Sequence, residues 1–367
     1  MELETKLKKG LMDLIDEVVD SGLCTSCGAC AGLCPYLRIY REKVAVIDQC
    51  GINEGQCYDI CPRTKTDYEE LNKQVFGENR DDFALGTHKR LLFGRSADKS
   101  VRERGQYGGT VSALAQHILV SRQAEAALLA GKNEKFPLLP EPVIATTPDE
   151  VLEASGSKYT ACPTLSLLEK ALKEHSSVAV VGRACQVTAL RKKQAINTEA
   201  MRASPVIGIF CMWALDYENL ESYLKPKINP ATVEKYDIPE GDFIVYTSNG
   251  SQRFSFDEIK STRRETCDLC YDFTSELADI SVGSTELEND WNTVIVRSEV
   301  GEKLWQNALE AGIVEEKPFP QDRIEVLRNA ALGKKKRAIA NLKEKFGSEG
   351  SQFGYLVLSD NEAGECE

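Results

Sequence analysis

The chain lacks the features that mark membrane, secreted, nucleic-acid-binding and hydrolytic proteins. No stretch approaches the roughly 20 apolar residues that cross a bilayer, and the first residues lack the apolar core of a secretory signal. A formal net charge of -12 gives no electrostatic support for nucleic-acid binding. Only three histidines are present, and no Ser/His/Asp arrangement, Walker A loop or G-x-G-x-x-G fingerprint appears. We therefore expect a cytoplasmic protein without a transmembrane segment, a nucleic-acid partner or hydrolytic chemistry.

Cysteine, by contrast, is abundant. The 367 residues include 13 cysteines, and in a reducing compartment such residues serve as metal ligands or catalytic groups more often than as disulfides. Seven of them fall between Cys24 and Cys61, five are scattered from Cys162 to Cys270, and Cys366 stands near the end. This distribution predicts one dense ligand module followed by a sparser set.

The first motif of the dense module is a run of four cysteines closed by a proline, with the spacing Cys24-x2-Cys27-x2-Cys30-x3-Cys34. Bacterial ferredoxins use this spacing: the first three thiolates bind one cubane cluster, and the fourth binds the other cluster. A structural zinc site is the alternative, but zinc usually takes two separated Cys-x2-4-Cys pairs. The run therefore favours iron–sulfur clusters over zinc.

A second half-motif, Cys57-Tyr-Asp-Ile-Cys61, repeats the ending of the first and is also followed by proline. Upstream of it, Gly51 and Glu54 occupy the positions where cysteines would fall, and Cys50 lies one residue early. The second cluster is then either a cubane with an unusual fourth ligand or a three-iron cluster. We assign the first cluster to Cys24, Cys27, Cys30 and Cys61, and the second to Cys34, Cys50 and Cys57.

The remaining sequence predicts an α+β or α/β architecture, because strand-like and helical stretches alternate. Expected strands lie at 177–182, 205–210, 243–246 and 293–297, and expected helices at 110–121, 165–174 and 301–311. The expected regions are an N-terminal helix (1–21), a two-cluster ferredoxin-like module (22–66), a polar connector (67–99), a large α/β domain (100–326), and a solvated basic helix with a loosely ordered acidic tail (327–367).

Four of the later cysteines also invite a metal-site interpretation. Cys185 and Cys211 each follow an expected strand, and Cys267 and Cys270 form a Cys-x2-Cys pair. Strand ends commonly converge on one edge of an α/β sheet, where ligands bind. Spacing alone leaves two possibilities open: a four-thiolate site, or two buried structural cysteines with an unrelated pair.

Six short sequence segments occur in a fixed order along the chain, at 54–63, 107–114, 156–159, 185–191, 267–274 and 276–283. Together they resemble the β-subunit family of coenzyme F420-dependent hydrogenases and formate dehydrogenases. The resemblance runs from about Leu23 to about Gly312, and hydroxymethyl-chlorophyll reductases look similar in the same segments. The resemblance implies FAD in the central domain, a coenzyme F420 deazaflavin docking over its ring, and a nearby [4Fe-4S] cluster held by Cys185, Cys211, Cys267 and Cys270.

The resemblance also suggests flavin-binding residues. A glycine loop before an expected helix can bring backbone N–H groups close to a phosphate or flavin carbonyl, although many glycine pairs merely turn the chain. Lys158 could neutralise a flavin anion or could be a surface lysine, and the two aspartates named below could simply cap turns. The candidate flavin residues are Gly108, Gly109, Thr110, Ser157, Lys158, Tyr159, Gln186, Asp272 and Asp279.

These features imply a converter between two-electron and one-electron chemistry, without a catalytic acid or base. Hydride would pass between coenzyme F420 and FAD, and single electrons would pass through the clusters to or from a partner. Formate dehydrogenase is the first expected partner, with hydrogenase and a heterodisulfide-reductase-type assembly as others. The alternatives are a ferredoxin-dependent reductase of another substrate and a non-catalytic relay that has lost its flavin.

Overall fold

The computed structural model describes residues 9–365, apart from residues 53, 239–240, 285–287 and 289. Its centre is an eight-stranded mixed sheet in the order β14-β4-β13-β12-β8-β7-β5-β6. The strands are β4 (Arg90–Ser96), β5 (Ala126–Gly131), β6 (Glu141–Ala145), β7 (Val178–Arg183), β8 (Val206–Ile209), β12 (Ile280–Gly283), β13 (Asn292–Val296) and β14 (Val314–Pro318). A mixed α/β fold is therefore confirmed.

The middle of this sheet is parallel and its flanks are antiparallel. β12, β8, β7 and β5 run in one direction, whereas β13, β4, β14 and β6 join through antiparallel pairs. Parallel strands are covered on both faces, which explains the continuous apolar runs of β7 and β8. Because β7 and β8 are parallel, the residues that follow them emerge at the same edge.

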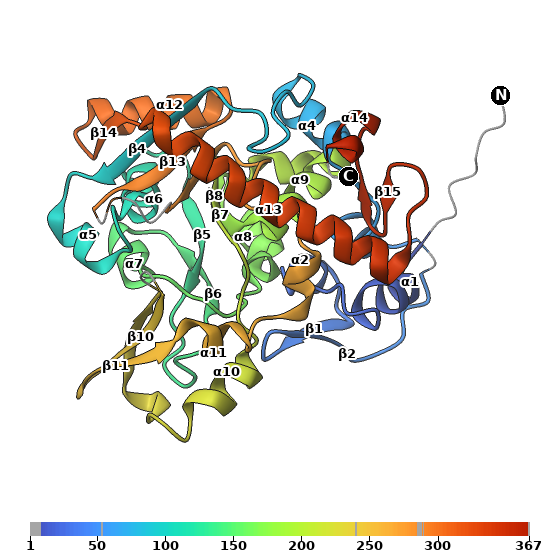
Figure 1. Ribbon diagram of the computed structural model, residues 1–367, viewed down its shortest axis with the longest axis horizontal. Coiled ribbons are helices and arrows are strands. Elements are labelled where there is room, and N and C mark those ends of the chain that lie inside the picture. Colours follow the sequence, from blue (N-terminus) through green and yellow to red (C-terminus); the bar gives the residue numbers. More distant parts are fainter. Residues whose placement is uncertain (1–8, 53, 239–240, 285–287, 289, 366–367) are drawn as a thin grey trace.

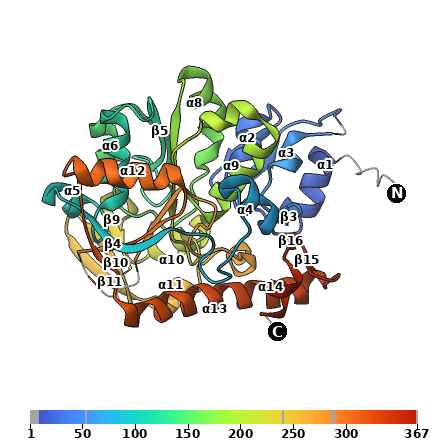
Figure 2. The same ribbon diagram turned by 90° about the horizontal axis from the view of Figure 1, so that it is seen from above.

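Helices cover both faces of the sheet. α13 runs across one face of the molecule, and α6 and α8 lie on the opposite side (Figures 1 and 2). A core of valine, isoleucine, leucine and alanine side chains, together with the fully buried Trp305, fills the space between sheet and helices. The main helices are α6 (Thr110–Val120), α8 (Leu168–Glu174), α9 (Ala184–Ile196), α12 (Glu299–Glu310) and α13 (Gln321–Phe346).

The cysteine-dense region forms a small unit of short elements beside the sheet. Its helix α1 (Leu11–Leu14) continues as a π-helical turn, η1 (Ile15–Val19). The other elements are α2 (Ala29–Leu33), the hairpin β1 (Leu37–Tyr40) and β2 (Lys43–Val46), and α3 (Gln56–Asp59). The first part of the expected helix over 1–21 lies outside the described residues.

Further elements complete the chain. The strands β9 (Val233–Asp237), β10 (Asp242–Thr247) and β11 (Gly250–Ser255) form a separate antiparallel sheet. The shorter helices are α5 (Lys99–Arg104), α7 (Pro148–Glu153), η2 (Thr164–Leu167), η3 (Thr198–Arg202), α10 (Tyr217–Leu224), η4 (Pro230–Thr232), α11 (Phe256–Lys260) and η5 (Glu265–Leu269). No helix in the described part of the chain is both long enough and apolar enough to span a bilayer.

Most expected elements of the central region have counterparts in the structure. The strands at 177–182, 205–210 and 293–297 correspond to β7, β8 and β13, and the helices at 110–121 and 301–311 to α6 and α12. The strand at 243–246 is β10, which belongs to the small sheet. The helix at 165–174 begins as the 3-10 turn η2 and continues as α8.

Two segments differ from expectation. The polar stretch 67–99 is no simple connector, because it contains α4 (Tyr68–Phe76) and strand β4 of the large sheet. The C-terminal tail is ordered: β15 (Gln352–Phe353) pairs with β16 (Leu356–Val357), β16 pairs with β3 (Thr66–Asp67), and α14 (Asp360–Gly364) follows. Long-range pairing with residues just after Cys61 explains this order, and local composition does not show it.

Candidate functional site

Four thiols, here called the proximal thiols, line one cavity at the carboxyl edge of the sheet. Cys185 lies in the first turn of α9 after β7, Cys211 follows β8, and Cys267 and Cys270 lie in and after η5. The cavity encloses about 370 Å³ of space outside protein atoms, part of it open to solvent. Its wall also carries four cations: Arg63, Arg183, Arg264 and Lys334.

The cations oppose the effect of burial on these thiols. Burial raises the pKa of Cys211 to about 12, although Lys334 and Arg183 act in the opposite direction. Burial would also raise the pKa of Cys270, but Lys334 and Arg63 hold it below its ordinary value. Lys334 donates hydrogen bonds to the carbonyls of Cys211 and Asp272. A positive wall of this kind suits an anionic thiolate-bound group.

The first ferredoxin thiols are Cys24, Cys27, Cys30 and Cys61, and they lie within electrostatic reach of one another. Burial is the main cause that raises the pKa of Cys27, and the thiols of Cys61 and Cys24 add to it. Burial likewise raises the pKa of Cys30, again with contributions from the other three. Thiolate ligands must be deprotonated, so metal binding at this group would release protons.

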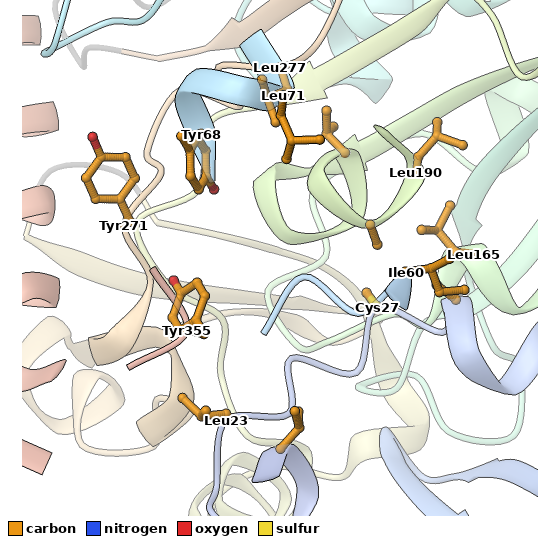
Figure 3. Close-up of a cluster of buried hydrophobic side chains, with 14 of the residues drawn as sticks. Leu23, Cys27, Ile60, Tyr68, Leu71, Leu165, Leu190, Tyr271, Leu277 and Tyr355 are labelled. Carbon is orange, nitrogen blue, oxygen red and sulfur yellow. The ribbon is translucent and has the colours of Figure 1, made fainter. Parts of the chain in front are cut away.

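The loop that carries these thiols is fixed by a close approach. Gly28 has φ +91°, and a Cβ atom there would lie 2.4 Å from the Pro163 carbonyl oxygen. The Cys27 carbonyl accepts a hydrogen bond from the N–H of Leu165 at 3.1 Å. Figure 3 shows Cys27 beside Ile60 and Leu165 in the buried cluster. A residue other than glycine at position 28 would therefore displace the cysteine loop.

The second ferredoxin thiols are Cys34, Cys50 and Cys57. Burial raises the pKa of Cys57 to about 11, and the thiols of Cys34 and Cys50 add to this effect. Cys34 and Cys50 are partly exposed. The Cys34 and Cys50 thiols therefore act electrostatically on Cys57, and the assignment of these three residues to a second cluster stays a prediction.

The three thiol groups follow one another in space. The Cys185 thiol raises the pKa of Cys27, although burial and the Cys61 thiol have larger effects. This interaction links the proximal thiols to the first ferredoxin thiols. The Cys57 thiol also raises the pKa of Cys30, although burial and the thiols of the first group have larger effects. This interaction links the first to the second ferredoxin thiols. The order is therefore proximal, first ferredoxin, second ferredoxin.

The thiol geometry fits multinuclear clusters better than single ions. A single zinc ion needs its sulfur ligands about 2.3 Å from one point. In the described ranges, no three Cys, His, Asp or Glu side chains converge closely enough to hold one metal ion. The proximal thiols instead surround a cavity with a cationic wall. These four cysteines are the residues that would hold an iron–sulfur cluster, because thiolates are its usual ligands.

The expected glycine loop lies at the same edge of the sheet and is tied to β13. The backbone N–H and hydroxyl of Thr110 both donate to the Asn292 carboxamide oxygen, at 3.2 and 2.8 Å. A Cβ atom at Gly108 would lie 2.8 Å from the same oxygen, and Gly109 has φ +65°. The Asn292 amide donates to the Gly283 carbonyl at 3.3 Å. The structure therefore explains Gly108 and Thr110 through packing against Asn292, a residue that the sequence did not single out. Gly109 is explained by its left-handed φ and its close approach to Val101 and Arg102.

The segment at 157–159 forms a polar cluster with Gln106 and Asp237. The Gln106 amide donates to the Tyr159 hydroxyl at 2.9 Å and to Asp237 Oδ1 at 2.6 Å, and Ser157 donates to Gln106. Tyr159 in turn donates to Asp237 Oδ1 at 3.3 Å. This network brings the glycine loop, through Gln106, next to Ser157 and Tyr159.

Lys158 is partly buried and has no carboxylate partner in the described part of the chain. Its amine donates to the carbonyls of Ala154 and Ser155. Burial and the neighbouring Lys132 lower the pKa of Lys158 to about 8. The two neighbouring amines make this place suited to an anionic ligand.

Three other candidate residues have partners within the fold. Gln186 accepts from the Arg183 N–H and donates to the Cys162 carbonyl, which caps α9. Asp279 accepts from the Val206 N–H and the Ser298 hydroxyl, and pairs with Arg191. Asp272 accepts from the Glu276 N–H, and burial raises its pKa. The structure does not place these three side chains in the wall of the cavity.

Sequence reasoning missed the cations of the cavity wall. Arg63 follows a Cys-Pro pair directly, and Lys334 belongs to a helix expected to be solvated; both are buried, at 3% and 1% exposure. Lysine and arginine are rarely buried without a partner. The position of Arg63 two residues after Cys61, a candidate ligand, was the one sequence signal that could have pointed to these cations.

The fold and the thiol arrangement define a cysteine-rich α/β protein with four thiols around one cavity at an edge of its large sheet. Two sequence families match it: the coenzyme F420 hydrogenase/dehydrogenase β-subunit N-terminal family over residues 91–169 and its C-terminal family over residues 175–322. The chain therefore belongs to the coenzyme F420 hydrogenase/dehydrogenase β-subunit family.

Three relatives illustrate the similarity. The coenzyme F420 hydrogenase subunit beta of Methanothermobacter thermautotrophicus is 33% identical over 70% of this chain and 95% of its own length. The coenzyme F420-dependent sulfite reductase of Methanocaldococcus jannaschii is 29% identical over 90% of this chain but only 52% of its own length. A chain of the F420-reducing [NiFe] hydrogenase complex of Methanosarcina barkeri superimposes with a TM-score of 0.68, at 30% identity, over 73% of this chain and 95% of that chain.

Proposed function

We propose that this chain is an F420-linked redox subunit that exchanges hydride with coenzyme F420 and passes single electrons along its three thiol groups. The observation that carries the proposal is the proximity of these groups: Arg63 lies beside Cys61 and also lines the cavity of the proximal thiols, and the Cys57 thiol acts electrostatically on Cys30. Family membership supplies the deazaflavin. Bound FAD would supply the conversion between hydride and single electrons, and [4Fe-4S] clusters would supply one-electron transfer.

The chain's own residues would bind and orient these groups. The proximal thiols would hold one cluster, and the cations of the cavity wall would offset its negative charge. Lys158 with Lys132 would attract the anionic part of the flavin or deazaflavin at the carboxyl edge, next to the loop at 105–110. The first and second ferredoxin thiols would carry the other two clusters, with the type and fourth ligand of the second still a prediction.

The partner is expected to dock near the second ferredoxin thiols. This group is the last in the spatial order, and Cys34 and Cys50 are partly exposed, so a partner's redox centre can approach it. Hydrogenase-type relatives favour a hydrogenase-type catalytic subunit as the partner. Formate dehydrogenase and a heterodisulfide-reductase-type assembly stay predictions.

The test is anaerobic oxidation of F420H2 by the full chain with a viologen acceptor. We expect iron and labile sulfide in the purified protein, about one FAD per chain, and F420H2-dependent viologen reduction. Protein replete in flavin but inactive with F420H2 would refute the deazaflavin assignment. Protein with clusters but without flavin affinity would instead indicate a non-catalytic relay.

Replacing Lys158 with methionine is expected to weaken FAD binding and to stabilise the flavin-free protein at neutral pH. The folded amine has its pKa lowered to about 8, so the folded chain binds fewer protons than the unfolded chain between pH 8 and about 10.4. Native stability therefore rises with pH across that window, and the advantage of Lys158→Met shrinks there. Urea unfolding at several pH values and FAD titration measure both effects.

Lys170→Met is the matched control, because Lys170 is exposed in the structure and is not part of the proposed anion site. It should leave the stability of the flavin-free protein nearly unchanged. Lys158→Met protein that is less stable than native at pH 7, with unchanged FAD affinity, would contradict the assignment of Lys158 to an anionic ligand.

A further inference from the structure

Arg63 lies between two of the thiol groups: it contacts Cys61 of one group and lines the cavity of the other. Its backbone N–H points to the Sγ atom of Cys61, one of the first ferredoxin thiols, at 3.5 Å. Its guanidinium lines the cavity of the proximal thiols. The side chain donates to the Leu269 carbonyl at 2.7 Å and to the Thr266 carbonyl at 3.4 Å, on either side of Cys267. Arg63 thus connects the segment of Cys61 to the segment of Cys267.

The guanidinium is buried without a carboxylate. Arg63 is 3% exposed, and among the described residues no Asp or Glu forms an ion pair with it. The ring of Tyr355 lies 4.4 Å from its guanidinium carbon, and the Tyr355 hydroxyl donates to the same Leu269 carbonyl. A buried charge is costly unless it is paired. The anionic partners that this position offers are the thiolates on its two sides.

Two other cations each lie beside one group, and a third borders both groups but already has a carboxylate partner. Lys192 donates to the Cys61 carbonyl at 2.7 Å and to the Thr64 hydroxyl at 2.8 Å, on the ferredoxin side. Lys334 donates to the carbonyls of Cys211 and Asp272, on the proximal side. Arg264 reaches the Cys24 carbonyl at 3.2 Å but pairs with Glu42 at 3.0 Å, so its charge is already matched.

We propose that Arg63 is the shared counter-cation of the proximal and first ferredoxin clusters and sets the reduction potentials of both. The proposal rests on the proposed function, since it requires clusters at both thiol groups. One electron that leaves the proximal cluster oxidises it and reduces the first ferredoxin cluster, and no proton moves. Because Arg63 is close to both clusters, its positive charge would stabilise the transferred electron on either one. The electron would therefore keep most of this stabilisation when it moves from one cluster to the other. Arg63 is a positioning residue, because it acts through the clusters.

The test is a redox titration of the full-length, anaerobic, iron-loaded protein, followed by electron paramagnetic resonance. Charge near a cluster is one determinant of its potential. Arg63→Met should lower both midpoint potentials, each by a tenfold change in the one-electron equilibrium, or about 59 mV. Lys192→Met should lower mainly the first ferredoxin potential, and Lys334→Met mainly the proximal potential. The proximal signal is identified as the one missing from Cys267→Ala protein.

Rescue by Arg63→Lys separates charge from structure. Lysine keeps the charge and should restore both potentials, whereas a purely structural role would lower iron content and leave the remaining potentials unchanged. If Arg63→Met protein does not retain iron, Arg63→Gln removes the charge and keeps a donor for the Leu269 carbonyl. Clusters that are present but shift at one group or at neither would overturn the proposal for Arg63 alone. Native protein without clusters would overturn the proposed function instead.

Discussion

Cys267→Ala protein is expected to reduce its bound flavin with F420H2 but to pass electrons to the ferredoxin clusters at less than about a hundredth of the native rate. Losing a group that only hydrogen-bonds to a metal ligand already costs roughly 10–100-fold in metal affinity or activity, and loss of the ligand itself costs more. Cys267 lines the cavity, where its Sγ atom accepts the Ala214 N–H at 3.3 Å. Rapid freezing after mixing with F420H2, followed by electron paramagnetic resonance, measures cluster reduction directly.

Cys162→Ala is the matched control for this experiment. Cys162 is buried, at 4% exposure, but it does not line the cavity. Its variant should lose some stability and keep the native rate of cluster reduction. Dithionite should still reduce the ferredoxin clusters of Cys267→Ala protein, which shows that they remain intact. Equal rates in the two variants would remove the proximal thiols from the electron path.

Part of the thiol grouping was accessible to sequence reasoning because that part is local. The spacing from Cys24 to Cys34 fits within one loop and helix α2, so the sequence alone indicates which thiols lie close together. Short apolar runs in the sequence likewise predict the strands β7 and β8 on either side of α9. Because these strands are parallel, Cys185 and Cys211 lie at the same edge of the sheet.

The rest depends on contacts between distant segments. Asn292 accepts a hydrogen bond from Thr110, which lies 182 positions away in the sequence. Arg63 donates to the carbonyl of Leu269, which lies 206 positions away. Neither partner carries a local pattern that distinguishes it from an ordinary polar residue. The same reason hid the order of the tail, whose strand β16 pairs with β3. The charged composition of α13 suggested solvent exposure, because buried lysines are rare without partners.

Lys335, one of the buried lysines of α13, belongs to an ionic network, and the loss of this network is expected to cost far more stability than the loss of a surface ion pair. Glu276 pairs with Arg80 at 2.5 Å and with Lys335, and all three side chains are at most 3% exposed. Arg80 also pairs with Glu362 of α14 at 2.8 Å. Breaking a buried pair leaves an uncompensated charge, so Glu276→Ala should lower the free energy of unfolding by about 3–5 kcal/mol.

The deficit of Glu276→Ala should depend on pH in a definite direction. Burial lowers the pKa of Lys335 to about 8, although Glu276 raises it, so removing the carboxylate lowers that pKa further. The variant then releases the Lys335 proton at a lower pH than the native protein does. Because stability rises with pH wherever the unfolded chain holds more protons, the deficit shrinks as pH approaches 8. Urea unfolding between pH 6 and pH 8 measures the trend.

Glu103→Ala is the control, since its pair with Lys99 lies at the surface and exposed pairs contribute little. A loss no larger than in this control would show that the buried network does not support the fold.

The network also bears on the proposed cluster site. Lys335 is the neighbour of Lys334, which holds the carbonyls of Cys211 and Asp272, so displacing this turn of α13 moves the cavity wall. Glu276→Ala protein should therefore lose iron from the proximal thiols before it loses iron from the first ferredoxin thiols.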